Sequence, residues 1–321
     1  LVGVREAPIT ATLAGLKKLV KEAHGRNIKV VLDMVFNHTS DRHKWFLKSA
    51  EHKHNPYSKW YVWNSRPLEG KWLGNVTGRT GWYYSMFHHS QVDLNYGLPV
   101  LSKENANSKN DPAIKRLWKE MLKVARYWFE LGIDGYRCDV AGGLGIKPFC
   151  REESILQDFW GEVKKIADSC GEKVLIGEEY KKTCETINSW AFDLAFTKYF
   201  LKIATAKEYY VNSDKQYIKS DFSGDPVDFD RALAEDTSGI TKKYGAIALP
   251  TANHDFGRQT SGTFDNDDLT ILTLLLVLTQ NCVPFIYYGD EIGIQNNITL
   301  PSVEGSFHRS MCRTPMQWDA S

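Results

Sequence analysis

Four short apolar runs, widely separated in the chain, each end in acidic, histidine or arginine residues. They are residues 30–38 (VVLDMVFNH), 133–140 (IDGYRCDV), 174–179 (VLIGEE) and 248–255 (ALPTANHD). A buried parallel strand reads as a near-continuous run of Val, Ile and Leu, so charged groups at its end need a separate explanation. In a barrel of alternating strands and helices, the C-terminal ends of the strands converge on one mouth, where functional sites are built. The pattern therefore predicts one shared site at the strand ends.

The side chains at these strand ends are of the types that acid–base chemistry uses. Because side chains alternate between the two faces of a strand, Arg137 and Asp139 should lie on the same face. Each acid alone is equally well explained by a solvated strand end or an ion pair, but that explanation is poor for all of them together. Retaining cleavage of a glycosidic bond needs two carboxyl groups about 5 Å apart, one ionised and one protonated. The set that indicates such a site is Asp33, His38, Arg137, Asp139, Glu178, His254 and Asp255.

The rest of the chain alternates between strand and helix patterns. Apolar periodicity predicts helices over residues 9–26, 111–131, 152–169, 227–243 and 265–280, and strands over 28–36, 133–140, 173–178, 192–196, 245–250 and 283–288. Thr10 or Thr12 can cap the first helix, and Asp111-Pro112 is a good helix start. The alternation stops between residues 39 and 110, which predicts an inserted subdomain. Six strands with helices between them predict an α/β fold with a parallel sheet.

Composition excludes several classes of function. With 321 residues and a formal net charge of +1, the chain offers no charge that favours nucleic acid or an anionic membrane as a partner. The most apolar run, residues 271–278, is far too short to span a bilayer. Six dispersed cysteines without a CxxC pair favour free thiols in a reducing compartment, which points to the cytoplasm. Aromatic residues make up 12% of the chain, which suits a protein that binds sugar rings, although most of these rings are expected in the core.

In chain order, the motifs DMVFNH, GYRCDV, GEE and NHD resemble the four sequence regions of the α-amylase superfamily, glycoside hydrolase family thirteen. In that family these regions close strands three, four, five and seven of a TIM-type (β/α)8 barrel. Two further matches narrow the branch. QVDLN (91–95) is similar to the QPDLN motif of oligo-1,6-glucosidases, maltases and trehalose synthases, with Val92 in place of proline. PFIYYGDEIG (284–293) and RTPMQWD (313–319) resemble the strand-eight region of that branch and the loop after it.

This resemblance implies catalytic roles for three acids. By position, Asp139 is the nucleophile, Glu178 the general acid/base, and Asp255 the third carboxylate, which holds the hydroxyl groups of the sugar. Glu179 is the local rival for the acid/base role. Alternation puts Glu179 on the opposite face from Glu178, and the family has its Glu directly after Gly, so Glu178 is favoured.

The resemblance also implies residues that bind or organise the substrate. Arg137 would keep Asp139 ionised, and the further positions of the sugar pocket are Asp33, His38, Val140, His254 and Arg258. In this branch a Val after the nucleophile goes with a preference for α-1,6 linkages over α-1,4 linkages. Asn37 matches a calcium ligand of the α-amylases, but this branch often lacks that site. No cofactor is therefore expected to be required, and calcium is an open alternative.

The family pattern implies how the chain is divided. Residues 1–38 correspond to part of the barrel (helix two and strand three), residues 39–111 to the subdomain inserted after the third strand, and residues 112–321 to strands four to eight. Strands one and two and the C-terminal β-domain of the family have no counterpart, so we expect this chain to be part of a larger protein. Ala141-Gly142-Gly143, directly after the nucleophile motif, differs from the bulkier residues common there.

The function implied is that of a retaining α-glucoside hydrolase of the oligo-1,6-glucosidase type. Its substrates would be short α-linked gluco-oligosaccharides, cleaved through a covalent glycosyl-enzyme intermediate. Three alternatives stay open: a trehalose-synthase-like isomerase or transglycosylase, an endo-acting α-amylase or cyclomaltodextrinase, and a non-catalytic family member. The presence of Asp139, Glu178 and Asp255 argues against the last of these.

Overall fold

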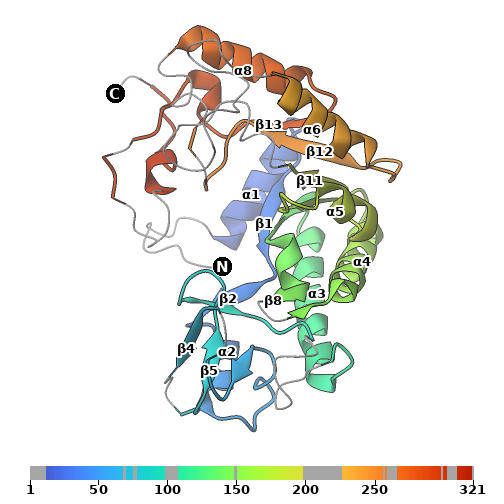
Figure 1. Cartoon of the computed structure of the whole chain (residues 1–321), viewed down its shortest axis with the longest axis vertical. Helices are drawn as coiled ribbons and strands as arrows, with labels where there is room; N and C mark the ends of the chain where they lie inside the picture. The colour runs from blue at the N-terminus through green and yellow to red at the C-terminus, as the bar shows by residue number, and fades with distance from the viewer. Residues whose placement is uncertain are drawn as a thin grey trace. The chain divides into compact units, whose positions relative to one another are not determined.

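The computed structural model describes residues 12–67, 70–74, 78–97, 108–147, 150–197, 226–255, 257–258, 266–297, 299–301 and 309–319. The chain forms two compact units (Figure 1). The first comprises Leu1–Glu179 and Ser189–Asp193, and the second Tyr180–Asn188 and Leu194–Ser321. The parallel sheet has six strands, of which each unit contributes three.

The first unit contains three parallel strands with helices between them. The strands are β1 (Val31–Val35), β7 (Gly135–Asp139) and β10 (Val174–Gly177), with β7 in the middle. The helices are α1 (Leu13–His24), α3 (Pro112–Glu130) and α4 (Glu153–Ser169). The predicted caps are confirmed, since the Thr12 side chain accepts a hydrogen bond from the Gly15 N–H and the Asp111 side chain accepts one from the Ala113 N–H. These caps satisfy N–H groups that have no partner inside the helix.

Residues between β1 and α3 form the short elements of the insertion. They are β2 (His38–Ser40), α2 (Lys44–Glu51), β3 (Trp63–Asn64), β4 (Trp72–Gly74), β5 (Trp82–Tyr84) and β6 (Gln91–Asp93). β2 pairs with β6, and β5 lies between β3 and β4. The ring of Phe46 contacts those of Tyr61, Trp63 and Tyr83 at centroid distances of 4.9–5.9 Å. These aromatic residues are core, as expected, and they belong to the same buried cluster as the residues that pack around β7.

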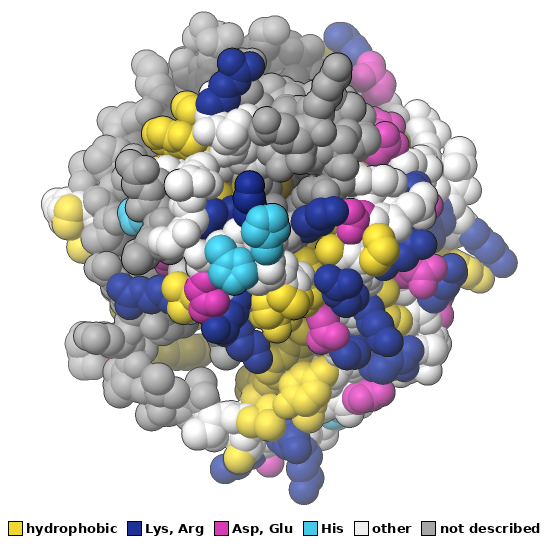
Figure 2. All heavy atoms as spheres, turned by 90° about the horizontal axis from the view of Figure 1, so that it is seen from below, with side chains coloured by type: hydrophobic (Ala, Val, Ile, Leu, Met, Phe, Trp, Pro, Cys, Tyr) yellow, Lys and Arg dark blue, Asp and Glu magenta, His cyan; other side chains and the backbone are white. Residues whose placement is uncertain are grey.

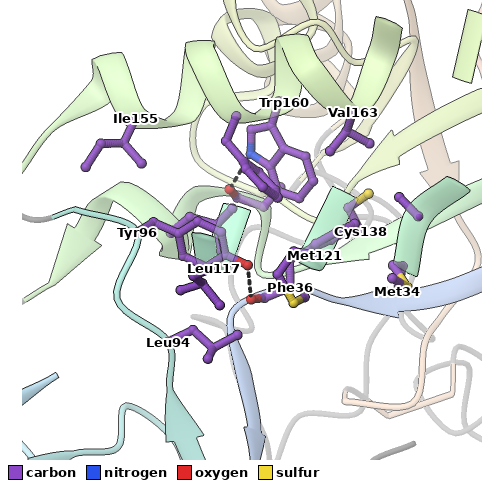
Figure 3. Close-up of a cluster of buried hydrophobic side chains, with 14 of the residues drawn as sticks. Met34, Phe36, Leu94, Tyr96, Leu117, Met121, Cys138, Ile155, Trp160 and Val163 are labelled. Carbon is purple, nitrogen blue, oxygen red and sulfur yellow. Dashed lines mark hydrogen bonds between the residues drawn. The ribbon is translucent and has the colours of Figure 1, made fainter. Parts of the chain in front are cut away.

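A dense aromatic core lies beneath the ends of β1 and β7 (Figure 3). Phe36 contacts Phe159 and Trp160 edge to face, at centroid distances of 5.4 Å and 5.2 Å. The Trp160 indole donates to the Ala141 carbonyl at 3.0 Å, and the Tyr96 hydroxyl donates to the Phe36 carbonyl at 2.7 Å. The chain just after each strand is therefore fixed from below by a buried hydrogen bond. After β7 come a 3-10 turn, η1 (Ala141–Gly145), and a small hairpin of β8 (Ile146–Lys147) and β9 (Cys150–Arg151).

The second unit repeats the strand–helix pattern. Its parallel strands are β11 (Leu194–Phe196), β12 (Ala246–Pro250) and β13 (Val283–Phe285), and its helices are α5 (Thr183–Ser189), α6 (Pro226–Ser238), α8 (Asp267–Thr279), η4 (Asp290–Ile292) and η5 (Arg309–Cys312). Phe229, Ile247, Leu249 and Val277 are among the residues of its own buried cluster. Two predicted ranges extend furthest past the C-terminal end of the observed element: the helix over 227–243 ends at Ser238, and the strand over 283–288 ends at Phe285.

Candidate active site

A single guanidinium group joins three predicted site acids in the first unit. Arg137 Nη1 lies 2.8 Å from Asp33 Oδ1 and 2.7 Å from Asp139 Oδ1, and Nη2 lies 2.7 Å from Glu178 Oε1. Burial alone would lower the pKa of Arg137, but the carboxylates of Glu178, Asp33 and Asp139 outweigh it and raise that pKa. Arg137 is therefore a fixed cation around which the acids are ordered.

Strand register explains why these side chains meet. In the parallel pairing of β1 with β7, Asp33 stands opposite Arg137, and Asp139 follows two residues later on the same face. On the other side of β7, Ile176 stands opposite Arg137. Glu178 comes directly after β10, where its backbone N–H still donates to the Cys138 carbonyl at 3.0 Å. Three neighbouring parallel strands thus deliver their C-terminal side chains to one place.

Glu178 and Glu179 have different surroundings. Glu178 contacts Arg137 through Oε1 and accepts the Val140 backbone N–H through Oε2 at 2.9 Å. Oε2 of Glu179 instead lies beside the backbone of Gly142, close to the Trp190 ring: a Cβ on Gly142 would be 2.5 Å from it. Of the two acids, Glu178 is the one that shares the Arg137 cation with Asp139.

His38 and Asn37 lie in a buried polar network at the base of the insertion. The His38 ring nitrogens lie 3.2 Å from Asn37 Nδ2 and 3.1 Å from Gln91 Nε2, and His38 is only 4% exposed. Asn37 Nδ2 also donates to Asp93 Oδ1 at 3.0 Å. These contacts tie β2 to β6 and account for the burial of Asn37 without a metal ion. Within the described ranges, no three His, Cys, Asp or Glu side chains converge as a metal site would require, and no step proposed below runs through calcium.

The second unit holds the other predicted acid among cations. Asp255 Oδ1 lies 3.2 Å from Arg309 Nη1, 3.4 Å from Arg313 Nη2 and 3.6 Å from His254 Nε2. Arg313 Nε also donates to the His254 carbonyl at 2.9 Å, and the Asn253 side chain accepts the Asp255 N–H at 2.8 Å. The carboxyl group of Asp255 is therefore oriented by cationic side chains, with 21% of its side chain exposed.

Arg258 is completely buried, with none of its side chain exposed. Nη1 donates to the Tyr288 carbonyl at 2.7 Å and to Asp290 Oδ1 at 3.0 Å, and Nη2 donates to the Cys312 carbonyl at 3.1 Å. Its guanidinium also lies over the rings of Tyr287 and Tyr288, at 4.6 Å and 5.0 Å from their centroids. These contacts leave Arg258 no surface for a sugar. Arg258 therefore positions the chain that follows β13 and the end of η5.

The predicted residues thus fall into two sets. Asp33, Asn37, His38, Arg137, Asp139, Val140 and Glu178 belong to the first unit, and His254, Asp255 and Arg258 to the second. Each set is brought together within its own unit. That the two sets face one substrate stays a prediction.

Sequence reasoning did not assign four residues that the structure ties to these sets. Asp93 holds Asn37, Asp290 holds Arg258, and Arg309 and Arg313 hold Asp255. Three of the four lie inside motifs that were noted only as marks of the branch: Asp93 in QVDLN, Asp290 in PFIYYGDEIG and Arg313 in RTPMQWD. Arg309 had no such signal.

Over the described part of the surface, charge is mixed. On the face shown in Figure 2, basic side chains are interleaved with acidic and hydrophobic ones. None of the described helices combines the length and the apolar composition needed to cross a bilayer.

Parallel strands alternating with helices, with acids gathered at the strand ends, define a TIM-type barrel domain of the kind that glycosidases use. Residues 8–321 match the family model described as "Alpha amylase, catalytic domain". The chain therefore belongs to the α-amylase catalytic-domain family, glycoside hydrolase family thirteen, and the resemblance inferred from the motifs is confirmed.

Individual relatives agree with this assignment. The chain is 28% identical to alpha-amylase 3 of Dictyoglomus thermophilum and 27% identical to an oligo-1,6-glucosidase of Parageobacillus thermoglucosidasius, in each case over 97% of its own length. Among solved structures, an α-amylase from H. orenii superposes with a TM-score of 0.74 at 26% identity, over 96% of this chain and 57% of that one. The chain spans 54% and 63% of the two relatives' lengths.

Proposed function

We propose that this chain is part of a retaining hydrolase that cleaves short α-linked gluco-oligosaccharides, of the oligo-1,6-glucosidase type. The observation that carries the proposal is the Arg137 guanidinium, which holds Asp139 and Glu178 together at 2.7 Å each. One guanidinium is narrow enough for its two partner carboxyl groups to have the separation of a retaining pair, about 5–5.5 Å. Membership of a glycoside hydrolase family supports the substrate class.

The chemistry takes two steps. Asp139 attacks the anomeric carbon, and the bond to the leaving oxygen breaks as Glu178 gives that oxygen its proton. A water molecule then loses a proton to Glu178, and its oxygen displaces Asp139 from the sugar. The overall result is hydrolysis with retention, because the anomeric carbon is inverted twice. Arg137 contributes by holding the Asp139 carboxyl group in one orientation through their ion pair at 2.7 Å.

Glu178 must alternate between two protonation states. Its contacts with Arg137 and with the Val140 N–H hold both oxygens in place. The first step uses the acid form of Glu178, and the second step uses its carboxylate form as a base.

Product analysis tests the reaction type. The full-length protein is incubated with maltose, isomaltose, trehalose and starch, and the products and their anomeric configuration are followed by NMR. Release of α-glucose from isomaltose or maltose supports the proposal. Conversion of maltose to trehalose would instead identify an isomerase, rapid loss of starch viscosity an endo-acting amylase, and no turnover of any of the four a non-catalytic protein.

Matched substitutions test the roles of the acids. Asp139→Asn should abolish formation of the glycosyl-enzyme, because an amide does not attack the anomeric carbon. Glu178→Gln should lower kcat/KM about 10²- to 10⁴-fold for glucosides with poor leaving groups and far less for activated aryl glucosides. Glu179→Gln is the matched control and should leave this leaving-group dependence unchanged. Equal losses on both substrate types in the Glu178 variant would exclude Glu178 as the acid.

A further inference from the structure

The backbone of Val140, directly after the proposed nucleophile, adopts an unusual conformation. Its φ is +44°, in the left-handed region, where a β-branched side chain is strained. Such a conformation persists only where the surroundings impose it. The neighbouring contacts show what imposes it here.

The pairing of β7 with β10 slips by one residue at this point. Glu178 donates its N–H to the Cys138 carbonyl, so in a regular parallel ladder the next N–H to reach the Glu178 carbonyl would be that of Val140. In the structure Ala141 occupies that position, donating to the Glu178 carbonyl at 3.1 Å. Val140 is thus an extra residue in β7, as in a β-bulge.

The slip frees the Val140 N–H for a different acceptor. It donates to Oε2 of Glu178 at 2.9 Å, while Arg137 Nη2 holds the other oxygen at 2.7 Å. The two groups together fix both the position and the rotation of the carboxyl plane. A carboxyl that must point first at a leaving oxygen and then at a water needs this degree of orientation.

Gly143 accommodates the bulge. The Gly143 N–H donates to the Val140 carbonyl at 2.7 Å, closing the turn. A Cβ on Gly143 would lie 2.7 Å from Val140 Cγ1 and 2.9 Å from Asn37 Oδ1, and one on Gly142 would meet the Glu179 carboxylate at 2.5 Å. The absence of a side chain at position 143 therefore leaves room for the Val140 side chain in this conformation.

We propose that the bulge at Val140 is a positioning device for the acid/base, in which the strained backbone directs its N–H at Glu178 and Gly143 leaves room for the strained residue. This inference rests on the proposed function, since it assigns a role within the same reaction. Val140 acts through Glu178, so it is a positioning residue and its side chain is not required for this role.

The decisive variant removes the N–H alone. Replacing Val140 by its α-hydroxy analogue turns the peptide bond into an ester and keeps the side chain. Losing one hydrogen bond to a charged group should lower kcat/KM about 10- to 100-fold for the disaccharide that the parent cleaves best. With 4-nitrophenyl α-glucoside, whose leaving group needs little protonation, the loss should stay within about threefold.

A second pair of variants tests whether Gly143 is needed to accommodate the bulge. Gly143→Ala should reproduce the selective loss on the disaccharide, because its Cβ would collide with Val140. Gly161→Ala is the matched control, since a Cβ there meets nothing within 4 Å, and it should behave as the parent. Circular dichroism of each protein confirms that it is folded before its rates are compared.

Each possible outcome either supports or overturns the positioning role of the Val140 N–H. An ester variant with the parent substrate ratio overturns the positioning role. A parent protein that does not turn over the aryl glucoside overturns the proposed function together with this inference. An active parent with a selective loss in the ester and in Gly143→Ala supports both.

Discussion

The buried Arg258 offers the sharpest test of how the second unit is held together. Its guanidinium donates to Asp290 at 3.0 Å and to the carbonyls of Tyr288 and Cys312 at 2.7 Å and 3.1 Å, and it has no exposed surface. Arg258→Met keeps much of the volume and removes all of these donors. We expect a large loss of folding free energy and no direct effect on sugar affinity.

The size of the loss in folding free energy follows from the polar groups that Arg258→Met leaves without a partner. Asp290, with 3% of its side chain exposed, would be a buried carboxylate without its cation, which costs about 3–5 kcal/mol. The two carbonyls lose their donors, which adds about 1 kcal/mol each. The expected destabilisation is thus about 5–7 kcal/mol, and the double variant Arg258→Met/Asp290→Asn should recover about half of it, because the unpaired charge is gone.

The loss of folding free energy in Arg258→Met should become smaller as the pH falls. Burial raises the pKa of Asp290, against hydrogen bonds from Thr251 and Arg258 that lower it, so removing Arg258 raises that pKa further. A raised pKa means that the folded state binds the proton before the unfolded state does. The stability of Arg258→Met should therefore increase as pH falls toward the unfolded-state value of about 4, and its deficit against the parent should narrow.

Urea unfolding at pH 7 and pH 5, followed by tryptophan fluorescence, measures these quantities. Arg66→Met removes an exposed arginine and serves as the control, with an expected change within about 0.5 kcal/mol. A loss below about 1 kcal/mol for Arg258→Met, accompanied by a raised KM, would refute the reasoning and return Arg258 to the substrate pocket.

Three further predictions concern the first unit. Val140→Thr should shift specificity from isomaltose toward maltose by about 1–3 kcal/mol in the ratio of kcat/KM values, measured with both disaccharides; a parent that already prefers maltose strongly would refute the linkage preference. Arg137→Met should lower kcat/KM for aryl glucosides at least about 100-fold, because the acids lose their shared cation, and unchanged rates would remove Arg137 from the mechanism. Although burial alone would raise the pKa of Asp134, hydrogen bonds from the Val30 N–H and His24 lower it, so its stabilising effect should be present at pH 7 and disappear as pH falls below about 4. Asp134→Asn should accordingly cost about 1–3 kcal/mol at pH 7 and much less at pH 3, measured by urea unfolding.

The regular features were predictable because they depend on short-range periodicity. The two-residue period of a strand placed Arg137 and Asp139 on one face. Capping preferences indicated Asp111 and either Thr10 or Thr12, of which Thr12 is a cap in the structure. Family motifs supplied the acids of the other strand ends. None of these inferences needed to know which residues meet across the fold.

The features that could not be predicted depend on contacts between distant residues. The helix predicted to reach residue 243 ends at Ser238, because the N–H groups of Thr241 and Lys242 bond to Asn188 instead of continuing the helix, and Gly239 packs closely on Cys184. The burial of Arg258 likewise depends on Asp290 and Cys312, which lie 32 and 54 residues further along.

The one-residue slip at Val140 is a further case of this kind. A register shift at the end of a strand leaves the hydrophobic pattern unchanged, so the period of the sequence carries no sign of it. The only trace in the sequence was the pair of small residues, Gly142 and Gly143, where the family has bulkier ones.

The insertion leaves and rejoins the barrel at almost the same point. β2 pairs with β6, so that Ser40 stands opposite Gln91, and the Asp41 N–H donates to the Ser90 carbonyl at 2.9 Å. A loop whose ends are fastened in this way can change its length at small entropic cost, about 0.6 kcal/mol for each doubling. Residues 41–90 therefore form a segment that recombination between relatives could exchange as a unit. The strands that carry Asp139 and Glu178 would keep their register in such an exchange. Chimeras joined at these two positions would be a practical route to new substrate ranges.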